Sequence, residues 1–215
     1  MKKLVFCAVV MLSAFSAICN AQGLLSKKTP RSAKEISYYL QPGIVPQEGR
    51  EVVFTHNTPT VGKSKADSHL ILSQWANLRY MPNTERGLWS DKDYFKNLEY
   101  AEVTKADGTQ WSIVCKGYEE QVFSNRALAK DYAVFTYDLV LSINDNSVDA
   151  TIRNIAYLYN LTDAQERIEA EDWITDKESL TKKGELNRIT GKFRVRTIDL
   201  VEQLFAEIDA ALSKL

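Results

Sequence analysis

The sequence predicts an α+β domain in which a five-stranded antiparallel sheet carries two helices on one face, in the order β-α-β-β-β-β-α. Two patterns lead to this class: a long hairpin between Ala133 and Tyr159, and an amphipathic helix toward each end of the domain. A third observation favours an antiparallel sheet. The outward face of the hairpin is polar, as at Thr136 and Arg153, which an antiparallel sheet tolerates and a doubly wound parallel sheet does not.

The first strand and the first helix have clear local signals. The apolar residues Val52, Val53 and Phe54 predict a strand over Glu51–His56. Ser64-Lys65-Ala66-Asp67 has the form of a capping box, which predicts a helix from there to about Tyr80. The helical spacing of four apolar residues predicts the face that packs on the core: Leu70, Ile71, Trp75 and Leu78.

The middle of the chain predicts two more strands. Glu99–Thr104 is the first, and Lys105-Ala106-Asp107-Gly108 is a turn because an Asp-Gly pair tolerates positive φ. A longer strand is expected from Gln110 to about Phe123. Trp111, Ile113 and Cys115 would share one face of it, and Gly117 would mark a bulge.

The hairpin pattern specifies its own register. With Asp145-Asn146 as a two-residue turn, one face pairs apolar residues: Ile143 with Val148, Leu141 with Ala150, Leu139 with Ile152, and Phe135 with Ala156. The other face places Asp138 opposite Arg153, which are of opposite charge. A shift by one residue would lose both features, so we expect this pairing.

The last third of the chain begins with a strongly charged segment, residues 160–190. Thr162–Ile174 is expected to hold a short helix, with Thr162 and Gln165 as a weak capping box, and Lys182-Lys183-Gly184 an exposed turn. The final helix is predicted over Thr197–Leu212. Its apolar stripe consists of Ile198, Val201, Phe205, Ile208 and Leu212.

The amino terminus predicts export. Residues 1–21 have the form of a signal peptide: Lys2 and Lys3, an uncharged apolar run from Leu4 to Ile18, and small residues around Ala21. Two alternatives stay open. One is a retained anchor, for which the run is short, and the other is lipidation at Cys19, which the preceding Ile18 fits poorly. We therefore expect the protein in the periplasm or on the outer cell surface.

The remaining chain divides into a partly irregular leader, residues 22–50, and a single domain, residues 51–215, with insertions at 83–98 and 160–190. It contains no second long apolar run, so no transmembrane segment is expected. Removing residues 1–21 takes away two lysines and no acids, which lowers the net charge from -1 to -3. A mildly acidic chain lacks the basic surface that nucleic acid requires, and we expect no such partner.

Few residue types in this chain suit catalysis or metal binding. Cys115 is the only cysteine after residue 21, which excludes an intramolecular disulfide, and its strand position predicts a buried structural thiol. The Cys, His and acidic residues of the sequence do not have the spacing of zinc sites or of EF-hand calcium sites. No metal and no cofactor are therefore expected. The acids Glu166, Glu169, Glu171 and Asp172 are typical of a solvated face. His56 and His69 are the histidines that a catalytic site would have to use.

Aromatic residues are the most suggestive candidates for a contact surface. Trp89, Tyr94 and Phe95 lie in the polar insertion 83–98, where exposed rings would stack on a sugar or anchor a protein partner. The alternative is that the insertion folds over the sheet and buries them as a satellite cluster.

The element order and several short stretches resemble an uncharacterised family of exported bacterial proteins, common in the Bacteroidetes, with a fold like that of the TATA-box-binding protein. The similar features are Gly62-Lys63-Ser64-Lys65, Trp75, Tyr137-Asp138-Leu139, Thr151-Ile152-Arg153-Asn154-Ile155 and Gly191-Lys192. The resemblance covers about residues 50–212. It implies a fold and a compartment, and it implies no catalytic residue.

These observations favour a non-enzymatic envelope module that binds an unknown envelope protein or glycan through Trp89, Tyr94 and Phe95. The alternative is a small-molecule-binding or hydrolytic enzyme. It would use carboxylates of residues 160–190, or a histidine, in a cleft beside the sheet.

Overall fold

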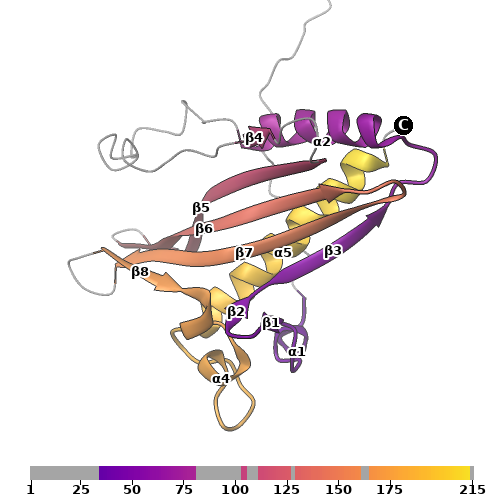
Figure 1. Ribbon diagram of the computed structural model, residues 1–215. Helices are drawn as coiled ribbons and strands as arrows, with labels where there is room; N and C mark the ends of the chain where they lie inside the picture. The colour runs from indigo at the N-terminus through magenta and orange to yellow at the C-terminus, as the bar shows by residue number, and fades with distance from the viewer. Residues whose placement is uncertain (1–33, 81–102, 106–110, 127–128, 161–164, 214–215) are drawn as a thin grey trace, which may run out of the picture. The chain divides into compact units, whose positions relative to one another are not determined.

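The computed structural model describes residues 34–80, 103–105, 111–126, 129–160 and 165–213 (Figure 1). The chain separates into two units, residues 1–34 and residues 35–215. The helices and strands described below belong to the second unit. Its helical segments are α1 (Ile36–Tyr39), α2 (Lys65–Arg79), the 3-10 turn η1 (Ala170–Asp172), α4 (Asp176–Ser179) and α5 (Gly191–Leu212). Its strands are β1 (Gln47–Glu48), β2 (Glu51–Val52), β3 (Phe54–Pro59), β4 (Val103–Lys105), β5 (Ser112–Arg126), β6 (Ala129–Ile143), β7 (Ser147–Asn160) and β8 (Gln165–Glu169).

The main sheet is antiparallel, as the sequence predicted for an α+β fold, and five of its strands follow the spatial order β3-β7-β6-β5-β4. A sixth strand, β8, pairs with residues 156–160 of β7, whereas β3 pairs with residues 147–152 of the same strand. Because β6 occupies the other edge of β7, β3 and β8 lie one after the other along a single edge.

The β6–β7 hairpin confirms the predicted register near its turn and departs from it farther away. Leu141 faces Ala150 and Asp138 faces Arg153, as expected. Beyond that point a bulge inserts one residue into β7, at Asn154, whose φ of 53° is a left-handed conformation that asparagine tolerates. Phe135 therefore faces Tyr157 instead of Ala156, so the predicted Phe135–Ala156 pair is wrong.

The bulge also changes which side chains face solvent. Arg153 and Asn154 follow each other in sequence, yet both are exposed, and the next residue, Ile155, returns to the core. Asn154 donates a 2.6 Å hydrogen bond to Asp138, the residue opposite Arg153.

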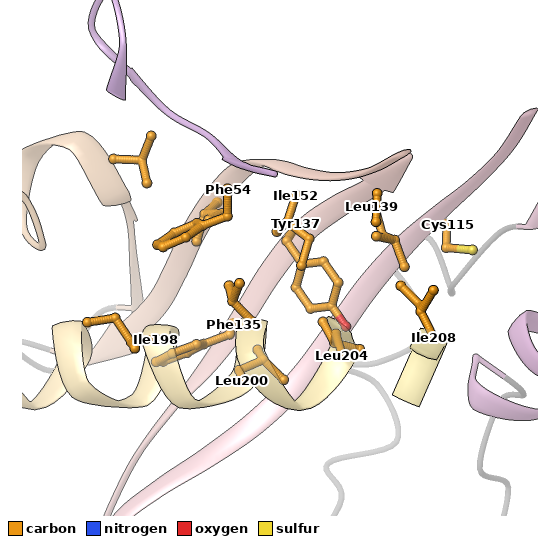
Figure 2. Close-up of a cluster of buried hydrophobic side chains, with 14 of the residues drawn as sticks. Phe54, Cys115, Phe135, Tyr137, Leu139, Ile152, Ile198, Leu200, Leu204 and Ile208 are labelled. Atoms are coloured by element: carbon orange, nitrogen blue, oxygen red, sulfur yellow. The ribbon is translucent and has the colours of Figure 1, made fainter. Parts of the chain in front are cut away.

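One hydrophobic core lies between the helices and the inner face of the sheet. Figure 2 shows Phe135 and Tyr137 of the sheet directed toward Leu200 and Leu204 of α5. The predicted stripe of α5 is confirmed: four of its five residues are buried, and Phe205 is partly buried. The helix begins at Gly191, six residues before the predicted start.

Helix α2 has the predicted start and a different buried face. Ser64 and Asp67 form the capping box. The buried residues include Leu72 and Ala76, whereas Leu70 is 58% exposed and Leu78 is 75% exposed. Of the four residues predicted to face the core, Ile71 and Trp75 pack against it as expected, whereas the prediction is wrong for Leu70 and Leu78. Three of the buried residues of α2, Ser68, Ser73 and Ala76, are small, and a face built from small residues carries a weak hydropathy signal.

Two local predictions around the sheet also change. The strand expected over Glu51–His56 is divided, because β2 pairs with β1 whereas β3 joins the main sheet. Within the expected leader, Tyr39 and Val45 are buried in the core. The strand predicted over Glu99–Thr104 is described only at its end, in β4; residues 99–102 lie outside the described part.

The charged segment 160–190 does not contain the helix predicted over Thr162–Ile174. Gln165–Glu169 forms strand β8 instead, because the free edge of β7 offers it a ladder of backbone hydrogen bonds. The predicted turn at Lys182-Lys183-Gly184 is confirmed, with Gly184 at a φ of 74°. None of the helices in the described ranges combines the length and apolar character that a membrane-spanning helix requires.

Arg194, on α5, is the largest fully buried side chain and connects three distant segments. Its guanidinium donates to the carbonyl oxygens of Tyr39, Gln41 and Ile174 at 2.7, 3.1 and 3.0 Å. Nη1 also lies 2.7 Å from a carboxylate oxygen of Asp176. The arginine therefore holds α1 and the segment before α4 against α5.

Candidate functional site

A hollow in the described part of the molecule lies where the end of β3 meets the C-terminal end of α5. We call it the β3–α5 hollow; it has a volume of about 390 Å³ and opens widely to solvent. It is lined by His56, Asn57, Thr58, Pro59, Asp209, Leu212 and Ser213. The two elements meet here because β3 lies at the sheet edge and α5 packs across the inner face (Figure 1).

Asp209 is the hydrogen-bonding centre of this hollow. His56 Nε2 lies 2.9 Å from Oδ1 and 3.1 Å from Oδ2 of Asp209. The Thr58 hydroxyl donates a 2.6 Å hydrogen bond to Oδ1. His56 also stacks on Phe205, with ring centroids 4.9 Å apart, which fixes the plane of the imidazole. The side chains of His56 and Asp209 remain 32% and 47% exposed, so both are accessible to a ligand.

The electrostatics of the hollow favour a permanent carboxylate. Burial opposes ionisation of Asp209, but the hydrogen bonds from Thr58 and His56 outweigh it and lower the pKa of Asp209 below its ordinary value of 3.8. Asp209 is therefore negatively charged at neutral pH.

The hydroxyl groups of this hollow are not arranged as nucleophiles. Thr58 donates its proton to Asp209, and Ser213 donates to the carbonyl oxygen of Ala210 at 3.1 Å. A nucleophilic hydroxyl must donate to its general base, as in a serine–histidine pair. The geometry therefore suits binding better than acyl transfer.

The lowered pKa of Asp209 predicts an acid dependence of stability. A carboxyl group with a depressed folded-state pKa stabilises the fold above its unfolded pKa, and this contribution is lost as the pH falls through the folded value. The difference in unfolding free energy between wild type and Asp209→Asn should be largest above about pH 5 and decline below about pH 4. Urea titrations at several pH values measure it. Thr58→Val removes one hydrogen-bond donor to Asp209, so the decline of unfolding free energy at low pH should be smaller in this variant. If the difference in unfolding free energy between wild type and Asp209→Asn stayed constant from pH 6 to pH 3, the lowered pKa of Asp209 would be contradicted.

The other histidine and the predicted acids do not join this hollow. His69 lies on α2, where it contacts Ser73 at 3.5 Å and the Trp111 ring. Glu171 accepts a 2.7 Å hydrogen bond from the backbone of Val52, and Glu169 pairs with Arg167. Glu169 is therefore a solvated surface group as the pattern indicated, whereas Glu171 is a half-buried acceptor that helps to hold β2.

Cys115 is fully buried, as the sequence predicted, and burial raises the pKa of its thiol to about 12. A thiol that is neither ionised nor accessible does not act as a nucleophile. Trp89, Tyr94 and Phe95 lie outside the described residues, so their role as a contact surface stays a prediction. Within the described ranges, no group of three or more His, Cys, Asp or Glu residues is placed to hold a metal ion.

A polar network lies between α2, the sheet and α5. Arg79 donates to Glu119 at 2.5 Å and to Glu207 at 3.1 Å. Tyr137 donates to the same oxygen of Glu119 at 2.6 Å and contacts the hydroxyl of Tyr80 at 3.2 Å. Burial raises the pKa of both tyrosines above the ordinary value, so they stay neutral. The network joins these elements, and the side chains of Arg79 and Glu119 within it are only 19% and 15% exposed.

The sheet face opposite the helices is a second candidate surface. Cross-strand pairs on β5–β7 place partly exposed apolar and aromatic groups beside charges. We call this the outer sheet face, and its central residues are Val114, Lys116, Tyr118, Asp138, Val140 and Arg153. Lys116, Asp138 and Arg153 lie in one row across the three strands. Asp138 accepts from Asn154, which leaves the Arg153 guanidinium exposed on the bulge.

Sequence reasoning missed Asp209 and the outer sheet face. Asp209 follows the buried Ile208 and is one polar residue among several beside the apolar stripe of α5. His56 was identified as one of two histidines, but its partner lies 153 residues away. The alternating polar residues of the hairpin were the one signal that the outer sheet face would be open to solvent.

Comparisons with known proteins agree with this architecture. Residues 54–158 match the model of a family described as a domain of unknown function (DUF4468) with TBP-like fold. The structure is similar to that of a DUF4468 family protein from Bacteroides ovatus, with a TM-score of 0.69 and 26% identity over 85% of this chain and 97% of the other. A comparison with curated proteins gives no match.

A TBP-like protein from Parabacteroides distasonis is also similar in fold, with a TM-score of 0.59 and 21% identity over 80% of this chain and 98% of the other. The family model covers the chain from β3 into β7, whereas the resemblance drawn from the sequence extends over about residues 50–212. Residues 54–158 therefore match the DUF4468 family model, and the fold of the chain is TBP-like.

Proposed function

We propose that the protein is a non-enzymatic module of the cell envelope that binds a protein or glycan partner through the outer sheet face. The observation that supports this most is the row Lys116–Asp138–Arg153, which lies between the apolar pair Val114–Val140 and Tyr118. An arginine beside apolar and aromatic groups is typical of energetically important interface positions.

The charges on this face argue against a nucleic-acid ligand. A phosphate backbone is bound by many lysines and arginines without intervening acids. Here an acid lies between the two basic residues, and Asp149 and Glu120 are also exposed. A partner with apolar groups and a carboxylate for Arg153 fits better. The amino-terminal sequence favours export, which supports a partner in the envelope.

Photo-crosslinking tests this proposal. A photoreactive amino acid at Val140 would be combined with the envelope fraction of the organism that encodes the protein. We expect one dominant adduct, whose yield falls at least tenfold in Arg153→Glu and is unchanged in Arg188→Glu, the same charge change at another exposed arginine. Trp89→Ala in the same assay tests the predicted 83–98 surface. An adduct that persists in Arg153→Glu, or that is lost equally in Arg188→Glu, would refute binding through the outer sheet face.

A second candidate function is small-molecule binding in the β3–α5 hollow. One specific observation favours it: the hollow is concave and presents an ionised carboxylate, that of Asp209, beside an accessible imidazole. Because Thr58 and Ser213 donate their protons elsewhere, we propose binding there without hydrolysis.

A further inference from the structure

We infer that the β3–α5 hollow binds an organic cation with a primary ammonium group and a short apolar chain. This inference rests on the second candidate function, small-molecule binding, and gives the chemical class of the ligand. The hollow, at about 390 Å³, has room for a molecule the size of an amino acid or a short alkylamine.

The charge of the hollow selects a cation. Asp209 and His56 are the two titratable residues among those that line it, and no lysine or arginine is among them. The Asp209 carboxylate is held in place by Thr58 and His56, and its side chain remains 47% exposed. Because this side chain is already fixed in position, it loses little conformational entropy when its carboxylate pairs with an ammonium ion, which favours binding.

The C-terminal end of α5 adds to the same field. The helix ends at Leu212, and its last turn contains no basic residue. The unpaired carbonyl groups at a helix C-terminus carry a partial negative charge, which favours a cation nearby. Ser213, the residue that follows, lines the hollow, so this end of the helix forms part of its wall.

The walls favour an organic cation over a metal ion. Pro59 and Leu212 supply apolar surface, which a hydrated metal ion does not use and an alkyl chain does. His56 and Asp209 would offer a metal two ligands, but they are bonded to each other, and no third His, Cys, Asp or Glu in the described ranges completes a site. An ammonium group instead needs hydrogen-bond acceptors, which Asp209 and the Ser213 hydroxyl provide.

Amide chemical shifts of Thr58 and Ser213 provide the test, in titrations with n-butylammonium chloride, methylammonium chloride, sodium acetate and zinc chloride. We expect n-butylammonium to bind with a dissociation constant on the order of 10 mM, and acetate not to bind. Asp209→Asn should weaken n-butylammonium about tenfold, whereas Asp172→Asn, at an exposed acid on η1, should leave the affinity unchanged.

A second variant keeps the test valid if Asp209→Asn folds poorly. Pro59→Ala retains the charge and removes apolar wall, so it should reduce the preference for n-butylammonium over methylammonium at least twofold. Equal affinity of wild type and a folded Asp209→Asn variant would overturn the inference, as would an unchanged preference in Pro59→Ala. Zinc or acetate binding in place of ammonium would refute the ligand class while leaving small-molecule binding in this hollow intact. If none of the four compounds changed the amide chemical shifts, both the ligand class and small-molecule binding in this hollow would be refuted.

Discussion

Replacement of Arg194 by methionine is expected to lower the free energy of unfolding by about 3–5 kcal/mol, because it removes one partner of a buried charged network. Methionine has a similar length and no donors. It would leave the carbonyl oxygens of Tyr39, Gln41 and Ile174 without this partner and Asp176 without the guanidinium. Three segments that meet at one side chain would then lose their common connection.

Urea denaturation measures this loss, and Arg188→Met is the matched control. Arg188 is exposed, so its replacement should change stability by about 0.5 kcal/mol or less. Arg194→Lys should lose most of the stability as well, since a single ammonium group cannot reproduce the fork of the guanidinium. If Arg194→Met and Arg188→Met had similar effects, the buried contacts of Arg194 would not stabilise the fold as described.

The second large effect is expected at Gly117, where a methyl group has no space. A Cβ added at Gly117 would lie 2.1 Å from the ring of Tyr137, the residue directly opposite on β6. The ring cannot move aside freely because its hydroxyl donates to Glu119 and contacts Tyr80. Gly117→Ala should therefore destabilise the protein by about 3 kcal/mol, at the upper end of overpacking effects.

A double-mutant cycle with Tyr137→Leu tests the cause of this effect. Leucine removes the ring that occupies the space above Gly117, so the alanine substitution should cost much less in that background. We expect a coupling free energy of about 1–2 kcal/mol between the two positions. Additive effects would show that the glycine is needed for another reason, such as backbone flexibility of β5.

The glycine also shows why the sequence misled at this position. A glycine inside a strand indicates either a bulge or a close approach, and the local pattern does not separate the two. The structure has the close approach at Gly117, and the irregularity in β5 lies between Val122 and Ser124 instead. The decisive atom belongs to Tyr137, twenty residues away in sequence, whose ring position depends on the hairpin register.

The comparison of α2 with α5 shows the limit of hydropathy patterns. In α5 the buried positions carry large apolar residues, so the stripe identified the core face. In α2 the buried residues are Ser68, Leu72, Ser73 and Ala76, whereas Leu70 and Leu78 are exposed. Tight packing favours small side chains at a helix–sheet contact, and these carry a weak hydropathy signal.

The sequence by itself determined the α+β class, the start of α2 at Ser64 and the register of the hairpin near its turn, because these depend on interactions between neighbouring or directly paired residues. Tertiary structure alone decided that Asp209 meets His56, that Arg194 collects carbonyl oxygens from α1 and the η1–α4 segment, and that residues 165–169 form a strand. Each of these depends on groups distant in the chain. Whether a charge is paired, buried or open to a ligand is decided by the elements packed around it, and local sequence does not encode that arrangement.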